Sequence, residues 1–239
     1  MDPPKSDRTN GLAFDGDTIE FLGWLLLTIL SALLIVPLAW TYAAICRWFC
    51  RNLRFPDRTT VTFTGTGPQI LGWMILGVVL SAATSIPHTI DPHFLLLIPA
   101  AIAGFFLGPL VHLMILRWLV RNLRLSSGPS LEFDGSYAGY LGYQVLIGIS
   151  VLTIVGWAWA LASFYRWIAE HTRGEGIAVG WNSDGWEVLG YTLAAILGSI
   201  PIVTIPWVWM WYIRWFTGCG TLTRGAGGSD SQAGMPVPL

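Results

Sequence analysis

The chain has very few charged residues. Asp, Glu, Lys and Arg make up 11% of its 239 residues, whereas soluble domains carry about 25%. Hydrophobic residues make up 54%, and the mean hydropathy is +0.58. No Lys or Arg occurs within residues 24–46, 73–116, 143–165 or 191–213. This composition excludes an ordinary soluble domain and predicts an integral membrane protein.

Recognisable catalytic motifs are also missing. The sequence contains no Gly-x-Ser-x-Gly, no Walker loop and no His-Glu-x-x-His. Its three cysteines form no disulfide framework. Cys46 and Cys50 are one helical turn apart, but a metal pair there would lack further Cys or His ligands. We therefore expect neither catalysis nor a cofactor.

A fourfold repeat is the main positive feature. Each repeat opens with an aromatic residue, any residue and a small residue; a Leu-Gly-aromatic triplet follows, and an Arg-aromatic pair comes after an apolar stretch. The opening aromatic residues are Phe14, Phe63, Phe133 and Trp181, the triplet glycines are Gly23, Gly72, Gly142 and Gly190, and the terminal arginines are Arg47, Arg117, Arg166 and Arg214. We expect a polar tail at 1–11, repeats at 12–55, 56–125, 126–177 and 178–222, and a disordered tail at 223–239.

Repeat 2 decides the transmembrane arrangement. Its Gly-to-Arg separation is 45 residues, against 24 in the others, and a turn-rich segment at 86–93 divides its apolar stretch into two arms of about 20 residues, enough to span a bilayer. The shorter repeats are either single crossings or short hairpins. The positive-inside bias favours hairpins, because every Arg cluster then shares one face. Pro37, Gly156 and Pro206 lie where their turns are needed.

These considerations predict an all-α integral membrane protein of four parallel repeats, each a helical hairpin. One hairpin is a long transmembrane hairpin. The other three have arms of about 12–15 residues, or roughly 18–22 Å, and must be short or re-entrant, because a bilayer core is about 30 Å thick. The cytoplasmic links are expected to be small and β-like, with Leu53-Arg54-Phe55 pairing with Thr60-Val61-Thr62-Phe63 across a turn.

Two groups of arginines suggest contact with lipid headgroups. Each group follows an i, i+4, i+7 spacing at a helix end, and its members are Arg47, Arg51, Arg54, Arg117, Arg121 and Arg124. Guanidinium groups there would pair with phosphate oxygens. The alternative interpretation is that these arginines only fix the membrane topology.

Tryptophans form a second set of candidates. Trp40, Trp159 and Trp207 each lie seven residues before a terminal Arg, and therefore on the same helical face as that Arg. They either pack between hairpins or form a stacking surface for a ring-bearing or lipid ligand.

Few polar residues interrupt the apolar arms. His88, Asp91 and His93 form the polar tip of the long hairpin, either as an ordinary loop or as part of a metal site that lacks a fourth ligand. His112 lies within an apolar arm, either as a packing residue or as a ligand of a haem or pigment.

Three segments carry a family resemblance: Trp159-Ala160, Arg166-Trp167-Ile168-Ala169-Glu170-His171-Thr172-Arg173 and the opener Trp181-Asn182-Ser183. Through the repeats, most of residues 12–222, and most clearly residues 131–217, resemble the YjgN-like family of bacterial multipass inner-membrane proteins. Leu161 and Ser163 depart from it, because the family has basic residues there. The resemblance implies an inner-membrane location and a mixture of short and long hairpins. It implies no activity, because the function of that family is unknown.

Together these features predict a non-enzymatic binding or scaffold protein of the bacterial inner membrane, with both termini cytoplasmic. Its expected partners are membrane phospholipids and other membrane protein subunits, with no nucleic acid. A transporter or channel for a small solute is the alternative function, and a lipid-modifying membrane enzyme is a further one.

Overall fold

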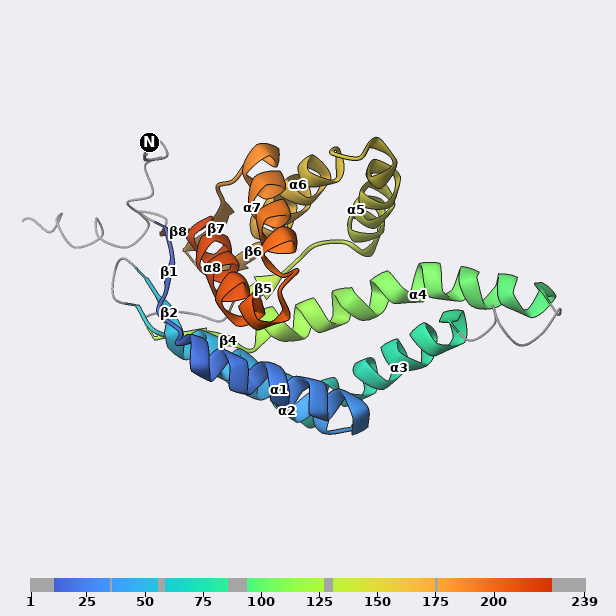
Figure 1. Ribbon diagram of the computed structural model, residues 1–239, viewed down its shortest axis with the longest axis horizontal. Coiled ribbons are helices and arrows are strands. Elements are labelled where there is room, and N and C mark those ends of the chain that lie inside the picture. The colour runs from blue at the N-terminus through green and yellow to red at the C-terminus, as the bar shows by residue number, and fades with distance from the viewer. Residues whose placement is uncertain are drawn as a thin grey trace, which may run out of the picture.

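A computed structural model describes residues 11–34, 36–55, 59–85, 94–126, 131–174 and 176–224. Within these ranges the order strand–helix–helix–strand occurs four times (Figure 1). The elements are β1 (Ala13–Phe14), α1 (Thr18–Leu34), α2 (Val36–Asn52), β2 (Leu53–Arg54), β3 (Val61–Phe63), α3 (Gly67–Ser85), α4 (Phe94–Arg121), β4 (Leu123–Leu125), β5 (Glu132–Phe133), α5 (Tyr137–Ser150), η2 (Val151–Thr153), α6 (Trp157–Glu170), β6 (Thr172–Gly174), β7 (Ile177–Trp181), α7 (Gly185–Gly198), η3 (Ile202–Thr204), α8 (Ile205–Gly218) and β8 (Gly220–Arg224). The predicted predominance of helix is confirmed.

Short strands close the base of every helical hairpin. β1 pairs with β2, β3 with β4, β5 with β6 and β7 with β8, all antiparallel. β6 also pairs with β7, so the last four strands form one sheet. Thr223 and Arg224, which we assigned to a disordered tail, belong to β8.

The predicted pairing of 53–55 with 60–63 is wrong. Leu53–Arg54 pairs with Ala13–Phe14, and Val61–Phe63 pairs with Leu123–Leu125. Two antiparallel helices bring the segments that flank them together, and this tertiary constraint prevails over the local turn. The strands were therefore identified correctly, but their partners were not.

The eight described helices form a closed ring. Each helix packs against the helix before it and the helix after it, and α8 returns to pack against α1. The backbone completes the closure, because Leu12 N donates to Gly220 O at 3.1 Å. The strands gather toward one side of the molecule, on the left in Figure 1, where β1 begins.

Helix breakers mark the start of each second arm in the short repeats. Pro37 is the second residue of α2, Gly156 caps the N-terminus of α6, and Pro206 is the second residue of α8. Proline is well accommodated in a first helical turn, where its missing N–H would have no partner. The 14-residue helices α5 to α8 are about 21 Å long, and the 28-residue α4 is about 42 Å long.

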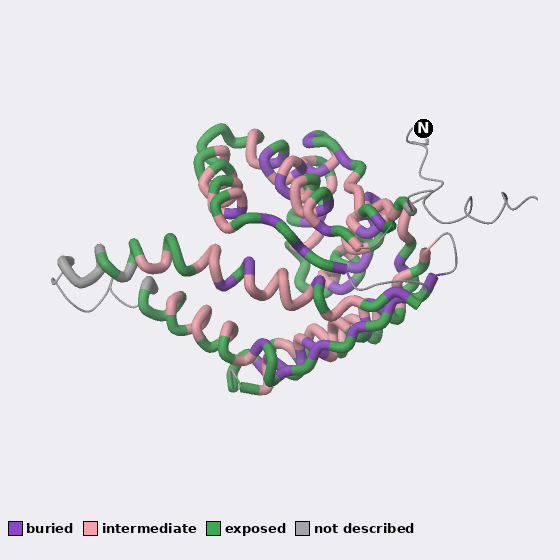
Figure 2. The backbone as a smooth tube through the Cα atoms, turned by 180° about the vertical axis from the view of Figure 1, so that it is seen from behind, coloured by how far each residue is buried: buried purple, intermediate pink, exposed green. Residues whose placement is uncertain are grey.

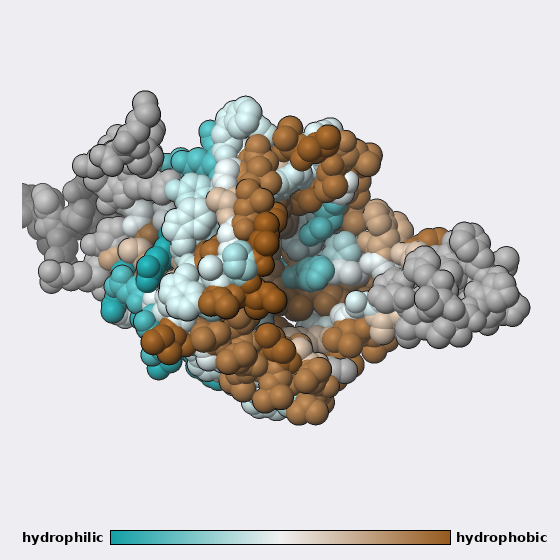
Figure 3. Space-filling view, viewed as in Figure 1, coloured by the Kyte–Doolittle hydropathy of each residue, from teal (hydrophilic) through white to brown (hydrophobic). Residues whose placement is uncertain are grey.

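One described helical stretch, Ala101–Arg121, is long and apolar enough to cross a membrane. Many large apolar side chains on the other helices are nevertheless exposed, including Leu33 at 77%, Leu152 at 82% and Ile202 at 80%. Hydrophobic residues cover much of the visible helical surface, while many hydrophilic ones gather at the strand side (Figure 3). Exposed apolar surface of this extent is larger than monomeric soluble proteins usually carry.

The buried residues lie at the junctions between repeats. Phe14 and Trp48 of repeat 1 pack with Met210 of repeat 4, and another cluster joins repeats 3 and 4 through Ala158, Val188 and others. The ends of α3 and α5 that lie away from the strands are mostly exposed (Figure 2). The buried residues therefore follow the ring, and many of them lie near the strands.

Candidate functional site

The terminal arginines tie neighbouring repeats together. Each donates a hydrogen bond to the backbone carbonyl of the small residue that opens the next repeat. The bonds are Arg47 Nη1 to Gly65 at 3.3 Å, Arg117 Nη2 to Gly135 at 3.1 Å, Arg166 Nη2 to Ser183 at 3.4 Å and Arg214 Nη2 to Gly16 at 3.2 Å. The last of these closes the ring. Two of the six arginines that we expected to contact headgroups, Arg47 and Arg117, thus bind the protein backbone.

In repeats 1 to 3 the opening aromatic residue packs on the Trp that follows the terminal Arg. Phe63 meets Trp118 edge-on with ring centroids 5.1 Å apart, and Phe14 and Phe133 make the same contact with Trp48 and Trp167. A Cβ atom at Gly65 would lie 2.6 Å from Trp118. The small residue of the opener is therefore required by close packing.

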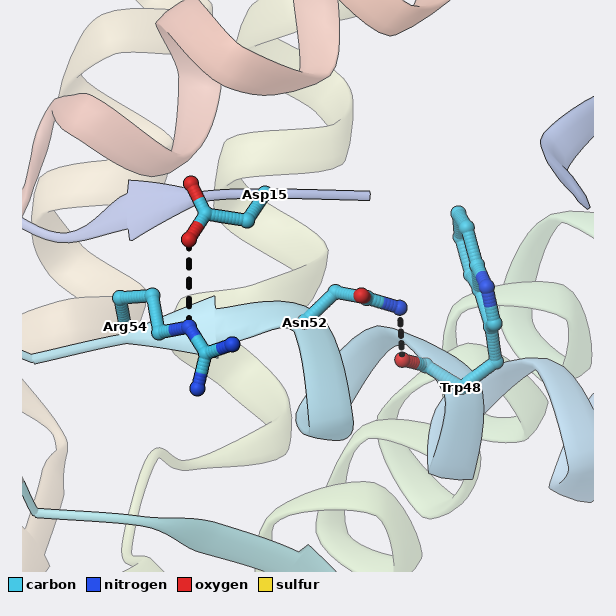
Figure 4. A network of polar contacts seen from close by, with 4 residues as sticks. All are labelled: Asp15, Trp48, Asn52 and Arg54. Atoms are coloured by element: carbon cyan, nitrogen blue, oxygen red, sulfur yellow. Dashed lines mark hydrogen bonds and ion pairs between the residues drawn. The ribbon is translucent and has the colours of Figure 1, made fainter. Parts of the chain in front are cut away.

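A second repeated bond ends each hairpin. The residue four positions after the Trp bonds back to the Trp carbonyl, as Asn52 Nδ2 does to Trp48 at 2.9 Å (Figure 4). Asn122, His171 and Cys219 take this place in the other repeats. Beside it, Arg54 Nε lies 3.2 Å from Asp15 Oδ2, with both side chains 61% exposed.

Two of the three tryptophans that lie seven residues before a terminal arginine, Trp40 and Trp159, lie at junctions between repeats. Cβ atoms at Gly67 and Gly185 would clash with the indoles of Trp40 and Trp159, respectively, so each indole covers the start of a helix in the next repeat. Trp40 is 45% exposed, Trp159 37% and Trp207 59%. Their outer surfaces are therefore available to neighbouring molecules.

An apolar cavity of about 400 Å³ lies against the strands. Strand-side positions that are equivalent in the repeats form most of its wall. The residue two positions before each opening aromatic contributes Leu12, Val61, Leu131 and Val179; the positions six and eight residues after the terminal Arg contribute Leu53, Phe55, Leu123, Leu125, Thr172 and Leu222. All four repeats thus face this cavity, which we call the central cavity.

The helical wall of the central cavity comes from repeats 1 and 2 alone. Tyr42, Ile45, Cys46, Phe49 and Cys50 line it from one face of α2, since residues spaced by three and four positions share a helical face. Leu119 of α4 completes this wall, with Phe63 and Thr221 at the strands. The cavity therefore has one asymmetric side, although its strand side is repeated.

The chemistry of the central cavity is that of hydrocarbon. Its wall is aliphatic and aromatic apart from Tyr42, Thr172, Thr221 and the two thiols. The Thr172 hydroxyl is already used in a hydrogen bond to Ile168 O at 2.8 Å. Such a wall offers almost nothing to a phosphate or a polar solute, and it suits apolar guests.

We did not identify the central cavity from the sequence. A usable signal was present, because Leu12, Val61, Leu131 and Val179 repeat an aliphatic residue two positions before the opening aromatic. Apolar residues in short strands are, however, equally typical of an ordinary core. Only the three-dimensional ring brings these positions to one place.

The remaining arginines of the predicted set are exposed. They are Arg51, Arg54, Arg121 and Arg124. Successive residues in a strand point to opposite faces, so Arg54 and Arg124 point away from the cavity that Leu53 and Leu123 line.

The predicted polar residues lie partly within the described ranges. His88, Asp91 and His93 lie outside the described residues. Within the described ranges, no three His, Cys, Asp or Glu side chains come close enough to hold a metal ion. His112 is exposed on α4 and lines a groove of about 460 Å³ together with residues of α3 such as Gly77 and Ser81.

Comparisons with other proteins give no identification: no family model, no curated protein and no solved structure matches the chain.

Proposed function

We propose that this chain is a membrane-embedded, non-enzymatic binding protein that holds a hydrocarbon chain, such as the acyl chain of a lipid, in the central cavity. The wall of that cavity is the observation that carries the proposal. Its volume of about 400 Å³ falls within the range of small-molecule pockets, roughly 300–1,000 Å³. Burying a methylene group contributes about 0.8 kcal/mol, so an apolar chain gains affinity without any polar contact.

The exposed apolar helices support a membrane location. In the proposed arrangement α3 and α4 form the full crossing, and the shorter hairpins are re-entrant or lie in a locally thinned bilayer. The arginine-bearing strand side faces the cytoplasm, according to the positive-inside rule. The bacterial inner membrane, suggested by the resemblance to the YjgN-like family, is part of the same proposal.

The exposed arginines then lie at the headgroup level. Arg51, Arg54, Arg121 and Arg124 would contact phosphates of surrounding lipids, each contributing about 1 kcal/mol near an anionic surface. Arg47 and Arg117 stabilise the ring instead, through the carbonyl groups of Gly65 and Gly135.

Filling the central cavity tests the proposal. Val179 lines the cavity, and its neighbour Ala178 on the same strand is exposed on the opposite face. Val179→Trp should weaken binding of the fluorescent fatty acid cis-parinaric acid by roughly tenfold or more, because the indole displaces two or more methylene groups. Ala178→Trp, the matched control, should bind it as the wild type does. Fluorescence titration of the purified protein measures both.

The thiols of the central cavity provide a second readout. Cys46 and Cys50 line the cavity, whereas Cys219 does not. Bound fatty acid should slow the reaction of Cys46 and Cys50 with N-ethylmaleimide and leave Cys219 unaffected, as followed by mass spectrometry of the labelled peptides. Equal affinity of wild type and Val179→Trp, together with unchanged thiol reactivity, would contradict the proposed function.

A further inference from the structure

Repeat 1 carries a groove on its surface that shares no residue with the central cavity. The groove has a volume of about 310 Å³, and we call it the repeat 1 groove. It lies between α1 and α2, and it is lined by Glu20, Gly23, Trp24, Leu27, Trp48 and Arg51. A Cβ atom placed at Gly23 would meet nothing within 4 Å, so this position faces open space.

The groove holds two opposite charges that do not pair with each other. Glu20 Oε2 accepts a hydrogen bond from Trp48 Nε1 at 2.6 Å. Within the described residues the other oxygen, Glu20 Oε1, has no hydrogen-bond partner, and the Arg51 guanidinium has neither a hydrogen bond nor an ion pair. A ligand with one anionic and one cationic group can therefore satisfy both.

The walls of the groove are those of a lipid site. The indole of Trp24 suits the headgroup level of a bilayer, where aromatic rings of this kind concentrate, whereas Trp48 is buried and lines the groove from the side of the core. Leu27 continues the groove along α1, and Leu30 and Leu34, spaced by three and four residues on the same face, are 60% and 65% exposed. The polar end of the groove thus leads onto an apolar helical surface that acyl chains can cover.

We propose that the repeat 1 groove binds the headgroup of a zwitterionic phospholipid with a primary amine, as in phosphatidylethanolamine. The phosphate pairs with Arg51, and the ammonium group donates to Glu20 Oε1, both through charge-assisted hydrogen bonds. An uncharged or anionic headgroup leaves the carboxylate of Glu20 without a cation. This inference rests on the membrane location in the proposed function, but it does not depend on the central cavity.

Repeat 2 offers a natural comparison. Gln69 stands where repeat 1 has Glu20, and it accepts the same bond, from Trp118 Nε1 at 3.0 Å. Arg121 stands at the position of Arg51. Repeat 2 therefore keeps the cation and the indole but lacks the carboxylate, a combination that suits anionic lipids.

Two reciprocal substitutions test the inference. Glu20→Gln should preserve the fold, since Gln69 shows that an amide oxygen at this position also accepts the indole hydrogen bond. In native mass spectrometry of protein exchanged with equal amounts of phosphatidylethanolamine and phosphatidylglycerol of matched chains, the wild type should retain mostly phosphatidylethanolamine in its first adduct. Glu20→Gln should lower the ratio of the two lipids by about tenfold, as expected for loss of one charge-assisted hydrogen bond. Gln69→Glu should raise that ratio.

The outcomes separate this inference from the proposed function. An unchanged lipid ratio in Glu20→Gln, with normal binding of cis-parinaric acid, would overturn the headgroup assignment and leave the central cavity standing. Loss of cis-parinaric acid binding in Val179→Trp with the lipid preference intact would support both. Glycerophosphoethanolamine, which has the headgroup without acyl chains, should not displace the bound lipid; displacement would overturn the assignment to a lipid.

Discussion

The small residue of each opener has two roles at the scale of single residues. Because Gly65 has no side chain, the rings of Phe63 and Trp118 can approach its Cα closely. The carbonyl oxygen of Gly65 accepts a hydrogen bond from the guanidinium group of Arg47. The same residue thus sets the packing within its own repeat and the connection to the preceding one. In repeat 4 Ser183 takes this place, and its carbonyl oxygen accepts a hydrogen bond from Arg166.

Adding one methyl group at Gly65 should therefore be destabilising. Gly65→Ala places a Cβ 2.6 Å from Trp118 and should lower the free energy of unfolding by about 1–3 kcal/mol, the usual effect of overpacking. Gly72→Ala is the matched control, because Gly72 lies within α3 with nothing within 4 Å of its Cβ position. That variant should be neutral or gain up to about 1 kcal/mol. Thermal unfolding in a fixed detergent measures both, and equal losses would refute the packing role.

At the scale of elements, the two strands that flank each helical hairpin pair with each other and hold the base of the hairpin together. Thr62 and Arg124 are Cα partners in the pair β3–β4. Directly opposed residues of antiparallel strands have Cα atoms about 4.5–5.5 Å apart, a separation that suits a disulfide.

An engineered disulfide should consequently form between β3 and β4, the strands that pair in the structure. In a background with Cys46, Cys50 and Cys219 changed to Ala, the pair Thr62→Cys with Arg124→Cys should oxidise readily. The pair Arg54→Cys with Thr62→Cys, which the local turn would favour, should not. Mass spectrometry of non-reduced peptides distinguishes them, and the reverse result would restore the hairpin that the sequence suggested.

The sequence predicts most of the helices and strands, but it predicts little of which strands pair and which repeats bond to each other. The spacing from Gly23 to Arg47 and its equivalents identifies helices and breakers, because helical periodicity and proline act locally. The partners of Leu53 and of Arg47 could not be predicted, since both depend on chain segments that only the packed helices bring together. The central cavity was missed for the same reason.

At the scale of the whole molecule, the closed ring allows the chain to begin at a link between two repeats whose strands do not pair with each other. Leu12 is bonded to Gly220, so the ends of the described chain lie side by side, while β2 and β3 belong to different sheets. No strand pairing between β2 and β3 is lost if the chain is opened between them.

A circular permutant should accordingly fold. A chain opened between Arg54 and Thr59, with residue 224 joined to residue 11 by a short Gly/Ser linker, should keep its helical circular dichroism and lose only a few degrees in Tm. A permutant opened between Leu193 and Ala194, within α7, should lose both folding yield and helicity. Comparable behaviour of the two would argue against the closed ring.

Ring closure also determines when repeat 1 can complete its contacts during synthesis of the chain. Arg214 is 198 residues beyond its partner Gly16, an interval of about 10–40 s at a translation rate of 5–20 residues per second. Until then the surface of repeat 1 that includes Phe21 and Trp24 lacks the Met210 and Ile213 against which it packs. Repeat 1, which is synthesised before the other three repeats, is therefore the last of the four to complete its contacts, and an insertase or protease would have the longest time to act on it.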